Sequence, residues 1–124
     1  YRDKYHRSGS FSTSSGYEMM NQLLNDNGKQ LPTFLFAEND AIAIGALRAL
    51  QEADIAVPDQ ISIVGFNDSK VAKYVYPPLS SIRVDTREMG RTGVSLLLDR
   101  IAYPRKISKK ISLSTEWIKR ASTK

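Results

Sequence analysis

The chain has 124 residues, of which 41% are hydrophobic and 25% are charged, a balance typical of one globular domain and not of a disordered segment. Its 18 Lys and Arg outnumber 13 Asp and Glu, and the net charge of +5 permits nucleic-acid binding without establishing it. The lack of cysteine excludes disulfides and thiolate sites, and it fits a reducing compartment as well as a secreted protein without cysteine. No apolar run is long enough for a membrane span. Because the chain opens on Tyr1 without methionine or a signal peptide, we expect it to be part of a longer protein.

The first half of the chain predicts a helix, a strand and a second helix. Ser14 or Ser15 is expected to cap a helix that runs to about residue 27. The apolar run 33–37 predicts a short buried strand, and Asp40 is expected to cap the helix that follows. The core face of that second helix is expected to hold Ala43, Ala46, Leu47, Leu50 and Ala53.

The second half of the chain continues the alternation. Strands are expected at 61–66 and 81–84, with a short helix over 69–74 between them. A third, long helix is expected to open at 85 or 86, and the tail 106–119 alternates enough to predict two short strands.

Strands that alternate with helices of about a dozen residues predict βαβ units and a parallel sheet, so the fold class is α/β. The strands at 34–37 and 61–66 are almost continuously apolar, which is typical of strands covered on both faces.

Polar residues follow two of these strands directly, and open α/β sheets bind ligands beyond the carboxyl ends of their strands. Asn39 and Asp40 follow the first strand, and Asn67 follows the second. Phe11, just ahead of the first helix, is a weaker candidate. Amide, carboxylate and aromatic groups together suit a polyhydroxylated ligand, because a ring packs on the apolar face of a sugar and polar groups pair with its hydroxyls.

Each candidate also has a structural interpretation. Asp40 is more often a helix cap than a ligand group, Asn67 is also a turn residue, and Phe11 is also an edge or core aromatic. His6 is the only histidine and has no carboxylate or serine at a useful spacing. Since no catalytic, phosphate-binding or metal-binding motif is present, we expect neither an enzyme nor a cofactor.

Several segments resemble the LacI/GalR family of bacterial transcription regulators, in the family's order and spacing. The segments, which cover nearly the whole chain from about residue 9, are PTFLFAENDAIAIGALRAL (32–50), VPDQISIVGFND (57–68), PPLSSI (77–82), MGRTGVSLLL (89–98) and TEWIKRAS (115–122).

The resemblance implies a longer protein with an N-terminal helix-turn-helix headpiece, a hinge helix and a two-lobed effector core like that of periplasmic sugar-binding proteins. Residues 1–79 are then part of the C-terminal lobe, 80–104 are a strand and helix of the N-terminal lobe, and 105–124 are a tail that returns to the C-terminal lobe. Operator DNA is expected to bind through the headpiece, which this chain lacks.

The resemblance also implies an effector site for a sugar-like small molecule that includes Phe11, Asn39, Asp40 and Asn67. Asn67 stands where sugar- and purine-responsive members of the family have an aspartate. An amide still pairs with a hydroxyl but lacks the charge assistance of a carboxylate, so this departure leaves the identity of the ligand open.

A homodimer is implied as well, because the family dimerises through its core. Ile44 projects about 100° away from the core face of the second helix, which supports an interface on that side. Extra core packing is the alternative. The residues expected at the interface are Ile44, Arg48, Gln51, Tyr74 and Val75.

Together these features predict the effector-sensing and dimerisation region of a cytoplasmic LacI-type repressor. The alternative is a periplasmic sugar-binding protein of a transport system, which shares the fold. The basic residues of the tail are expected to form a solvated surface and not a DNA-reading element. They are Arg105, Lys106, Lys109 and Lys110.

Overall fold

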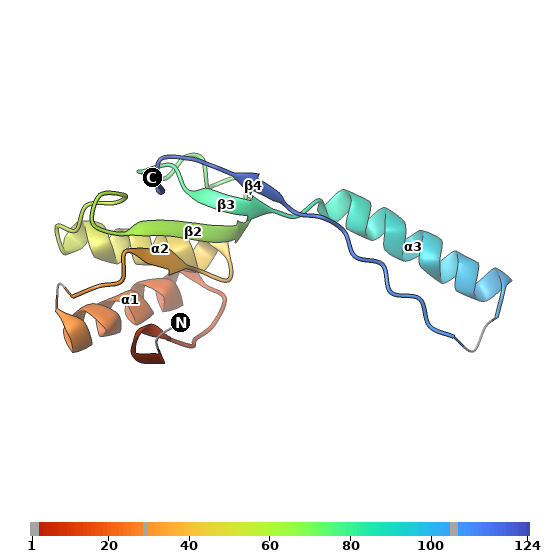
Figure 1. Cartoon of the computed structure of the whole chain (residues 1–124), viewed down its shortest axis with the longest axis horizontal. Coiled ribbons are helices and arrows are strands. Elements are labelled where there is room, and N and C mark those ends of the chain that lie inside the picture. Colours follow the sequence, from red (N-terminus) through yellow and green to blue (C-terminus); the bar gives the residue numbers. More distant parts are fainter. Residues whose placement is uncertain (1–2, 29, 105–106) are drawn as a thin grey trace.

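The structure, a computed structural model, describes residues 3–28, 30–104 and 107–124. Helices and strands alternate along most of the chain, which confirms the predicted α/β class (Figure 1). The elements are a 3-10 turn at Asp3–Tyr5, α1 (Thr13–Asn27), β1 (Phe34–Phe36), α2 (Asp40–Glu52), β2 (Ser62–Asn67), β3 (Ser80–Arg83), α3 (Thr86–Ala102) and β4 (Glu116–Ile118).

The sheet has four strands in the order β1-β2-β3-β4. The first three run parallel, and β4 pairs antiparallel with β3. The register places Phe36 beside Val64 and Asn67 beside Arg83. The carboxyl ends of the three parallel strands therefore lie at one edge, where the sequence predicts a ligand site.

Two helices pack together against one face of the sheet, and their crossing is a backbone contact. A Cβ atom at Gly16 would lie 2.2 Å from the carbonyl oxygen of Ile42, and one at Gly45 would lie 2.0 Å from that of Thr13. Only glycine allows α1 and α2 to approach so closely. The core beneath them contains the predicted face of α2, namely Ala43, Ala46, Leu47 and Leu50, with Ala53 packed against it.

The β1 edge of the sheet and the outer face of β1 are uncovered, so the expectation that β1 is covered on both faces is wrong for this chain. Leu35 packs toward the core, whereas Phe34 and Phe36 are about half exposed. Within the part of the chain that the structure describes, the outer edge of β1 pairs with no strand. A groove of about 960 Å³ lies there, bounded by residues 5–9, α1 and β1.

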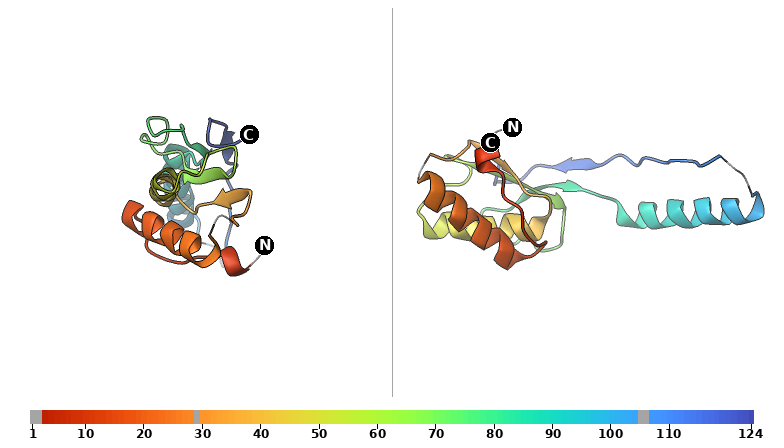
Figure 2. Two further views of the ribbon diagram at one scale, coloured as in Figure 1. Left: turned by 90° about the vertical axis from the view of Figure 1, so that its left-hand side faces the viewer. Right: turned by 90° about the horizontal axis from the view of Figure 1, so that it is seen from below.

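The helix α3 projects from the end of the sheet, and residues 107–115 run back alongside it (Figures 1 and 2). Asp85 caps α3 by accepting a hydrogen bond from the Glu88 N–H at 2.9 Å, which confirms the predicted start. No residue of α3 is buried. The large apolar side chains that it exposes are Met89, Val94, Leu97, Leu98 and Ile101.

Two predicted elements are wrong. Residues 69–74 form turns with i→i+3 hydrogen bonds from Ala72 to Ser69 and from Tyr74 to Val71, not a helix. The tail forms one strand and not two, because its residues 107–115 lie beside α3, where no strand edge is available for pairing.

The chain after β4 is held in the body of the molecule by Ser122, which is fully buried. Its N–H donates to the Pro78 carbonyl at 3.0 Å, and its hydroxyl donates to the Ile63 carbonyl at 2.7 Å. The tail thus returns to the sheet from which the chain left at β3. Of the basic tail residues, Lys109 pairs with Asp99 of α3 at 3.0 Å, while residues 105 and 106 lie outside the described residues.

Candidate ligand-binding site

The start of α2 and the loop after β2 lie in direct contact at the carboxyl edge of the sheet. Asp40, the first residue of α2, accepts hydrogen bonds from the Ser69 N–H at 2.5 Å and from the Ser81 hydroxyl at 2.6 Å. The Asp68 N–H in turn donates to the Ser81 hydroxyl at 3.0 Å. The two polar segments that the sequence singles out after β1 and β2 therefore meet.

Asn39, and not Asp40, caps α2. Its backbone is extended, and its side-chain oxygen accepts a hydrogen bond from the Ile42 N–H at 2.8 Å. The cap is the last extended residue before the helical turn, and this boundary falls one position earlier than predicted. The cap does not use the amide nitrogen of the Asn39 side chain, and a contact between Asn39 and a ligand stays a prediction.

Asp40 is only 2% exposed, and its carboxylate lies against Gly65. A Cβ atom at position 65 would lie 2.2 Å from the Asp40 Oδ1 atom, so the glycine makes room for this carboxylate. Because its two oxygens already accept from Ser69 and Ser81, Asp40 holds the loop in place. This arrangement disfavours the predicted direct contact between Asp40 and a ligand.

The loop itself adopts an uncommon backbone. Asn67 has a φ of 93° and Asp68 a φ of 51°, both in the left-handed region. Asn and Asp adopt this region more readily than other non-glycine residues, yet such strain costs on the order of 1–3 kcal/mol for each residue and concentrates at ligand-binding sites. Asn67 is exposed and is the last residue of β2, one position from its predicted place directly after the strand, and its role in binding stays a prediction.

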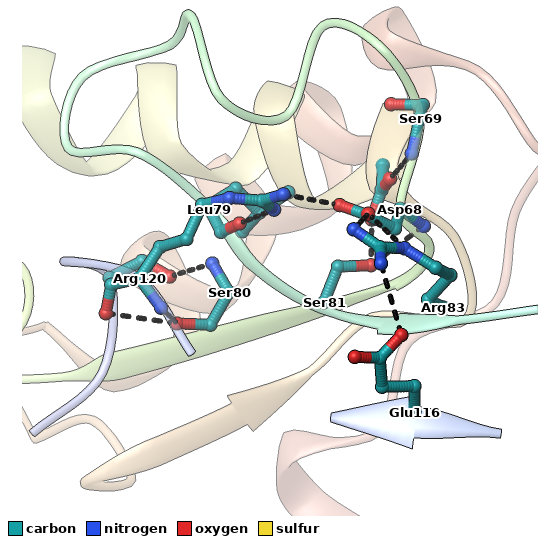
Figure 3. Close-up of polar contacts among 10 residues, drawn as sticks. Asp68, Ser69, Leu79, Ser80, Ser81, Arg83, Glu116 and Arg120 are labelled. Atoms are coloured by element: carbon teal, nitrogen blue, oxygen red, sulfur yellow. Dashed lines mark hydrogen bonds and ion pairs between the residues drawn. The ribbon is translucent and has the colours of Figure 1, made fainter. Parts of the chain in front are cut away.

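Asp68 bridges two arginines from different parts of the chain (Figure 3). Its Oδ1 atom lies 2.6 Å from an Arg120 nitrogen, and its Oδ2 atom lies 2.7 Å and 2.8 Å from two nitrogens of Arg83. Arg83 also reaches Glu116, the first residue of β4, at 3.0 Å.

The Asp68 side chain is 7% exposed, and burial alone would raise the pKa of its carboxyl group. The hydrogen bonds and charges of Arg120 and Arg83 outweigh burial, so the pKa of Asp68 lies below its ordinary value. The same pairing raises the pKa of Arg83. The Asp68 carboxyl group is therefore ionised, and the two arginines hold it in place beside Asn67.

Phe11 lies one residue before Ser12, which caps α1 in place of the predicted Ser14 or Ser15. Phe11 is 69% exposed, so it is not a core aromatic, which was one of the alternatives that the sequence allowed. Stacking on a ligand stays a prediction. A second aromatic group lies at the strand ends, where the exposed Phe36 meets Phe66 edge to face with ring centroids 6.4 Å apart.

Sequence reasoning missed three residues that shape this edge: Ser81, Arg83 and Arg120. Ser81 and Arg83 alternate along β3, so both side chains point to the face where Asp40 and Asp68 lie. That alternation could have predicted that Ser81 and Arg83 share a face of the sheet. No sequence pattern predicts the contact of Arg120, because Arg120 lies 52 residues from Asp68 and reaches it only through the return of the tail.

The predicted interface residues are not equally exposed. Arg48, Gln51 and Tyr74 are exposed, and Gln51 donates a hydrogen bond to the Tyr76 carbonyl, which joins α2 to the turn segment. Ile44 and Val75 are partly buried and pack against the core, so core packing accounts for part of their apolar character. Dimerisation itself stays a prediction.

Within residues 3–28, 30–104 and 107–124, no cluster of three or more His, Asp or Glu side chains that could hold a metal is found. In the same described ranges, no helix has the length and apolar character to cross a membrane.

Comparisons with known proteins agree with one another. The profile of the periplasmic binding protein-like domain matches residues 2–123. The HTH-type transcriptional regulator GalR of Streptococcus thermophilus is 50% identical over 116 residues, which are 94% of this chain and 35% of that regulator. The chain therefore spans about a third of the length of the curated relatives that it matches.

Solved structures give the same result. The transcriptional regulator CelR in complex with cellobiose superposes with a TM-score of 0.89 at 32% identity, over 98% of this chain and 37% of that one. A LacI family transcriptional regulator from Enterococcus faecium with bound ribose superposes with a TM-score of 0.77 at 36% identity, over 92% of this chain and 41% of that one.

Proposed function

The chain belongs to the periplasmic binding protein-like family, in its LacI/GalR group of transcription regulators, and we propose that it is the effector-sensing part of a sugar-responsive repressor. The relatives are regulators and not enzymes, and they favour this function over a periplasmic binding protein that feeds a transporter. The observation that carries the proposal is the strained loop at Asn67 and Asp68, clamped beside the start of α2 at the carboxyl edge of the sheet.

A sugar suits the groups that this edge presents. The Asn67 and Asn39 amides donate and accept hydrogen bonds to vicinal hydroxyls, and the exposed ring of Phe11 supplies an apolar surface for a sugar face. The similar CelR structure holds cellobiose, and the similar E. faecium structure holds ribose, which supports a carbohydrate as the ligand class.

The rest of a longer regulator is proposed to cover the two apolar surfaces that this chain leaves open. These are the groove at the β1 edge and the exposed face of α3. In this assignment residues 1–79 belong to the C-terminal lobe, 80–104 to the N-terminal lobe, and 105–124 return to the C-terminal lobe. A sugar bound between the lobes then biases their relative angle, provided that it binds one arrangement more tightly than the other.

The same proposal covers the partners of the whole protein. Operator DNA is bound by a helix-turn-helix domain outside this chain, and two copies of the regulator pair through the surface of Arg48, Gln51 and Tyr74. The protein acts in the cytoplasm, where a repressor meets DNA.

The test is sugar binding by the intact regulator, measured by calorimetry with ribose, cellobiose and D-glucose as probes. Replacing Asn67 by Ala removes an amide that pairs with a hydroxyl, and we expect about a 10-fold loss of affinity. Phe11→Ala is expected to weaken binding by about 5-fold, because a stacked aromatic contact contributes on the order of 1 kcal/mol.

Asn25→Ala is the matched control, because Asn25 is an exposed asparagine of α1 away from the edge. It is expected to bind each sugar as the parent protein does. Unchanged affinity in both Asn67→Ala and Phe11→Ala would remove this site assignment, and no binding of any of the sugars by the parent would contradict the ligand class.

A further inference from the structure

Asp68 lies beside both chain segments that connect the sheet to the projecting part of the molecule, which consists of α3 and residues 107–115 (Figure 1). Arg83 is the last residue of β3, after which the chain leads into α3, and Glu116 is the first residue of β4, where the chain returns. The two are register partners and are joined by an ion pair of 3.0 Å. Asp68 holds this pair through Arg83.

The third connection is to the tail. Arg120 lies 2.6 Å from the other carboxylate oxygen of Asp68 and also donates to the Leu79 carbonyl at 2.6 Å. Each oxygen of Asp68 thus serves a different arginine, one at the exit of the body and one in the segment that follows β4 (Figure 3). One carboxylate links the loop, the outgoing strand and the returning tail.

We propose that Asp68 is a positioning residue that transmits a movement of the Asn67 loop to β3 and β4, and so couples ligand binding to the projecting part. This inference rests on the proposed function, since it takes Asn67 as a ligand-contacting residue. Asp68 does not itself touch the ligand.

The Asp68–Arg120 pair is the least exposed part of this network, since the side chains of Arg83 and Glu116 are 46% and 64% exposed. The Asp68 side chain is 7% exposed and that of Arg120 is 17% exposed, so water does not readily replace either partner. Charge-assisted pairs of this kind are short and directional, and they resist separation when one partner moves. A displacement of Asp68 is therefore expected to move Arg120 with it, and to move Arg83 through the two contacts that Arg83 makes with the Asp68 Oδ2 atom.

The backbone of the loop is held separately, which allows coupling to be tested without destroying the site. The Asp68 N–H is held by Ser81, and the Ser69 N–H is held by Asp40. Asp68→Asn keeps these contacts and suits a positive φ, while it removes the charge that binds both arginines.

The experiment compares sugar affinity with the operator response in the intact regulator. Ribose and cellobiose are the probes for calorimetry, and binding to the operator fragment is measured with and without each sugar. We expect Asp68→Asn to bind the sugar within about 3-fold of the parent, while the change in operator affinity caused by that sugar falls by about 10-fold. A merely structural role would not separate these two readouts.

Arg83→Gln is the second variant, and it decides the question if Asp68→Asn does not fold. It leaves the Asp68–Arg120 pair and the loop contacts in place, and it is expected to reduce the operator response in the same way. Arg83→Lys, which keeps the charge, is expected to restore part of the response. Asp26→Asn, which breaks the ion pair between Arg7 and Asp26 of α1, is the matched control and is expected to change neither readout.

A parental operator response in both Asp68→Asn and Arg83→Gln would overturn the coupling role. So would a loss of sugar affinity in Asp68→Asn with its operator response intact. If the parent protein binds none of ribose, cellobiose and D-glucose, the proposed ligand class fails and this inference falls with it. That outcome is distinct, because it is seen before any variant is made.

Discussion

The helices α2 and α3 have the same kind of sequence pattern but differ in how much of it they bury. Both are amphipathic, both have a side-chain cap, and both follow a strand of the sheet. Yet α2 buries seven residues against α1 and β2, and α3 buries none. An apolar stripe on a helix therefore predicts that the helix has a partner, but it does not predict that the partner belongs to the same chain segment.

The chain accordingly has two regions of different character. The body (residues 3–28, 30–83 and 116–124) contains the apolar core, and the arm (residues 84–104 and 107–115) leaves its apolar side chains exposed. If the apolar face of the arm is covered only by a part of the protein outside this chain, the same type of substitution should change the free energy of unfolding differently in the body and in the arm.

The largest difference is expected from removing a large apolar side chain. Leu50 of α2 is fully buried, so Leu50→Ala should lower the free energy of unfolding of the 124-residue chain by about 2–5 kcal/mol. Leu97→Ala in α3 should change it by less than about 0.5 kcal/mol, because Leu97 is exposed. Denaturant unfolding of the two variants measures both values.

The same two substitutions can also be compared in the intact regulator. There Leu97→Ala should become destabilising by more than about 1 kcal/mol, because the N-terminal lobe is proposed to cover this face. An equally small effect in the segment and in the intact protein would mean that the α3 face has no cover at all.

A smaller contrast is expected between two helical glycines. Gly45→Ala places a methyl group 2.0 Å from the Thr13 carbonyl oxygen, so α1 and α2 must move apart, and a loss of about 1–3 kcal/mol is expected. Gly93→Ala meets no atom within 4 Å and should stabilise α3 by about 0.5–1 kcal/mol through helix propensity. Helicity from circular dichroism and thermal unfolding measure the two effects, and a stabilising Gly45→Ala would show that the helix crossing is not tight.

The smallest effect concerns pH and the junction between body and arm. The pKa of Asp68 is lowered in the folded state, so its pairing stabilises the fold above the ordinary carboxyl pKa of about 4. This contribution should disappear as the pH falls through the lowered value. The unfolding free energy of the parent should therefore exceed that of Asp68→Asn at pH 7, and the difference should shrink toward pH 2.

Asp26→Asn is expected to change the unfolding free energy at pH 7 less than Asp68→Asn does, because the Asp26 side chain is 62% exposed and its ion pair with Arg7 is open to water. A parent-minus-variant difference for Asp68→Asn that stays constant from pH 7 to pH 2 would contradict the role assigned to its charge.

Local patterns in the sequence predicted most of the elements and their order. The three helices and the three parallel strands were expected within about two residues of their bounds, because each has a periodic apolar pattern and a turn or cap signal beside it. Asn39, Asp40 and Asn67 were found for the same reason, since each directly follows a strand. The errors at Asn39 and Ser12 were errors of cap position, where several adjacent residues have capping side chains.

The sequence by itself thus determined the α/β class, the family and the edge of the sheet at which a ligand is proposed to bind. Only the tertiary structure decided that Asp40 is buried beneath the loop, that Asp68 joins Arg83 to Arg120, and that α3 stands uncovered. The physical reason is distance along the chain. Caps and apolar periods act over a few residues, whereas Asp68 and Arg120 are 52 residues apart and meet only because β4 and the tail return to the sheet.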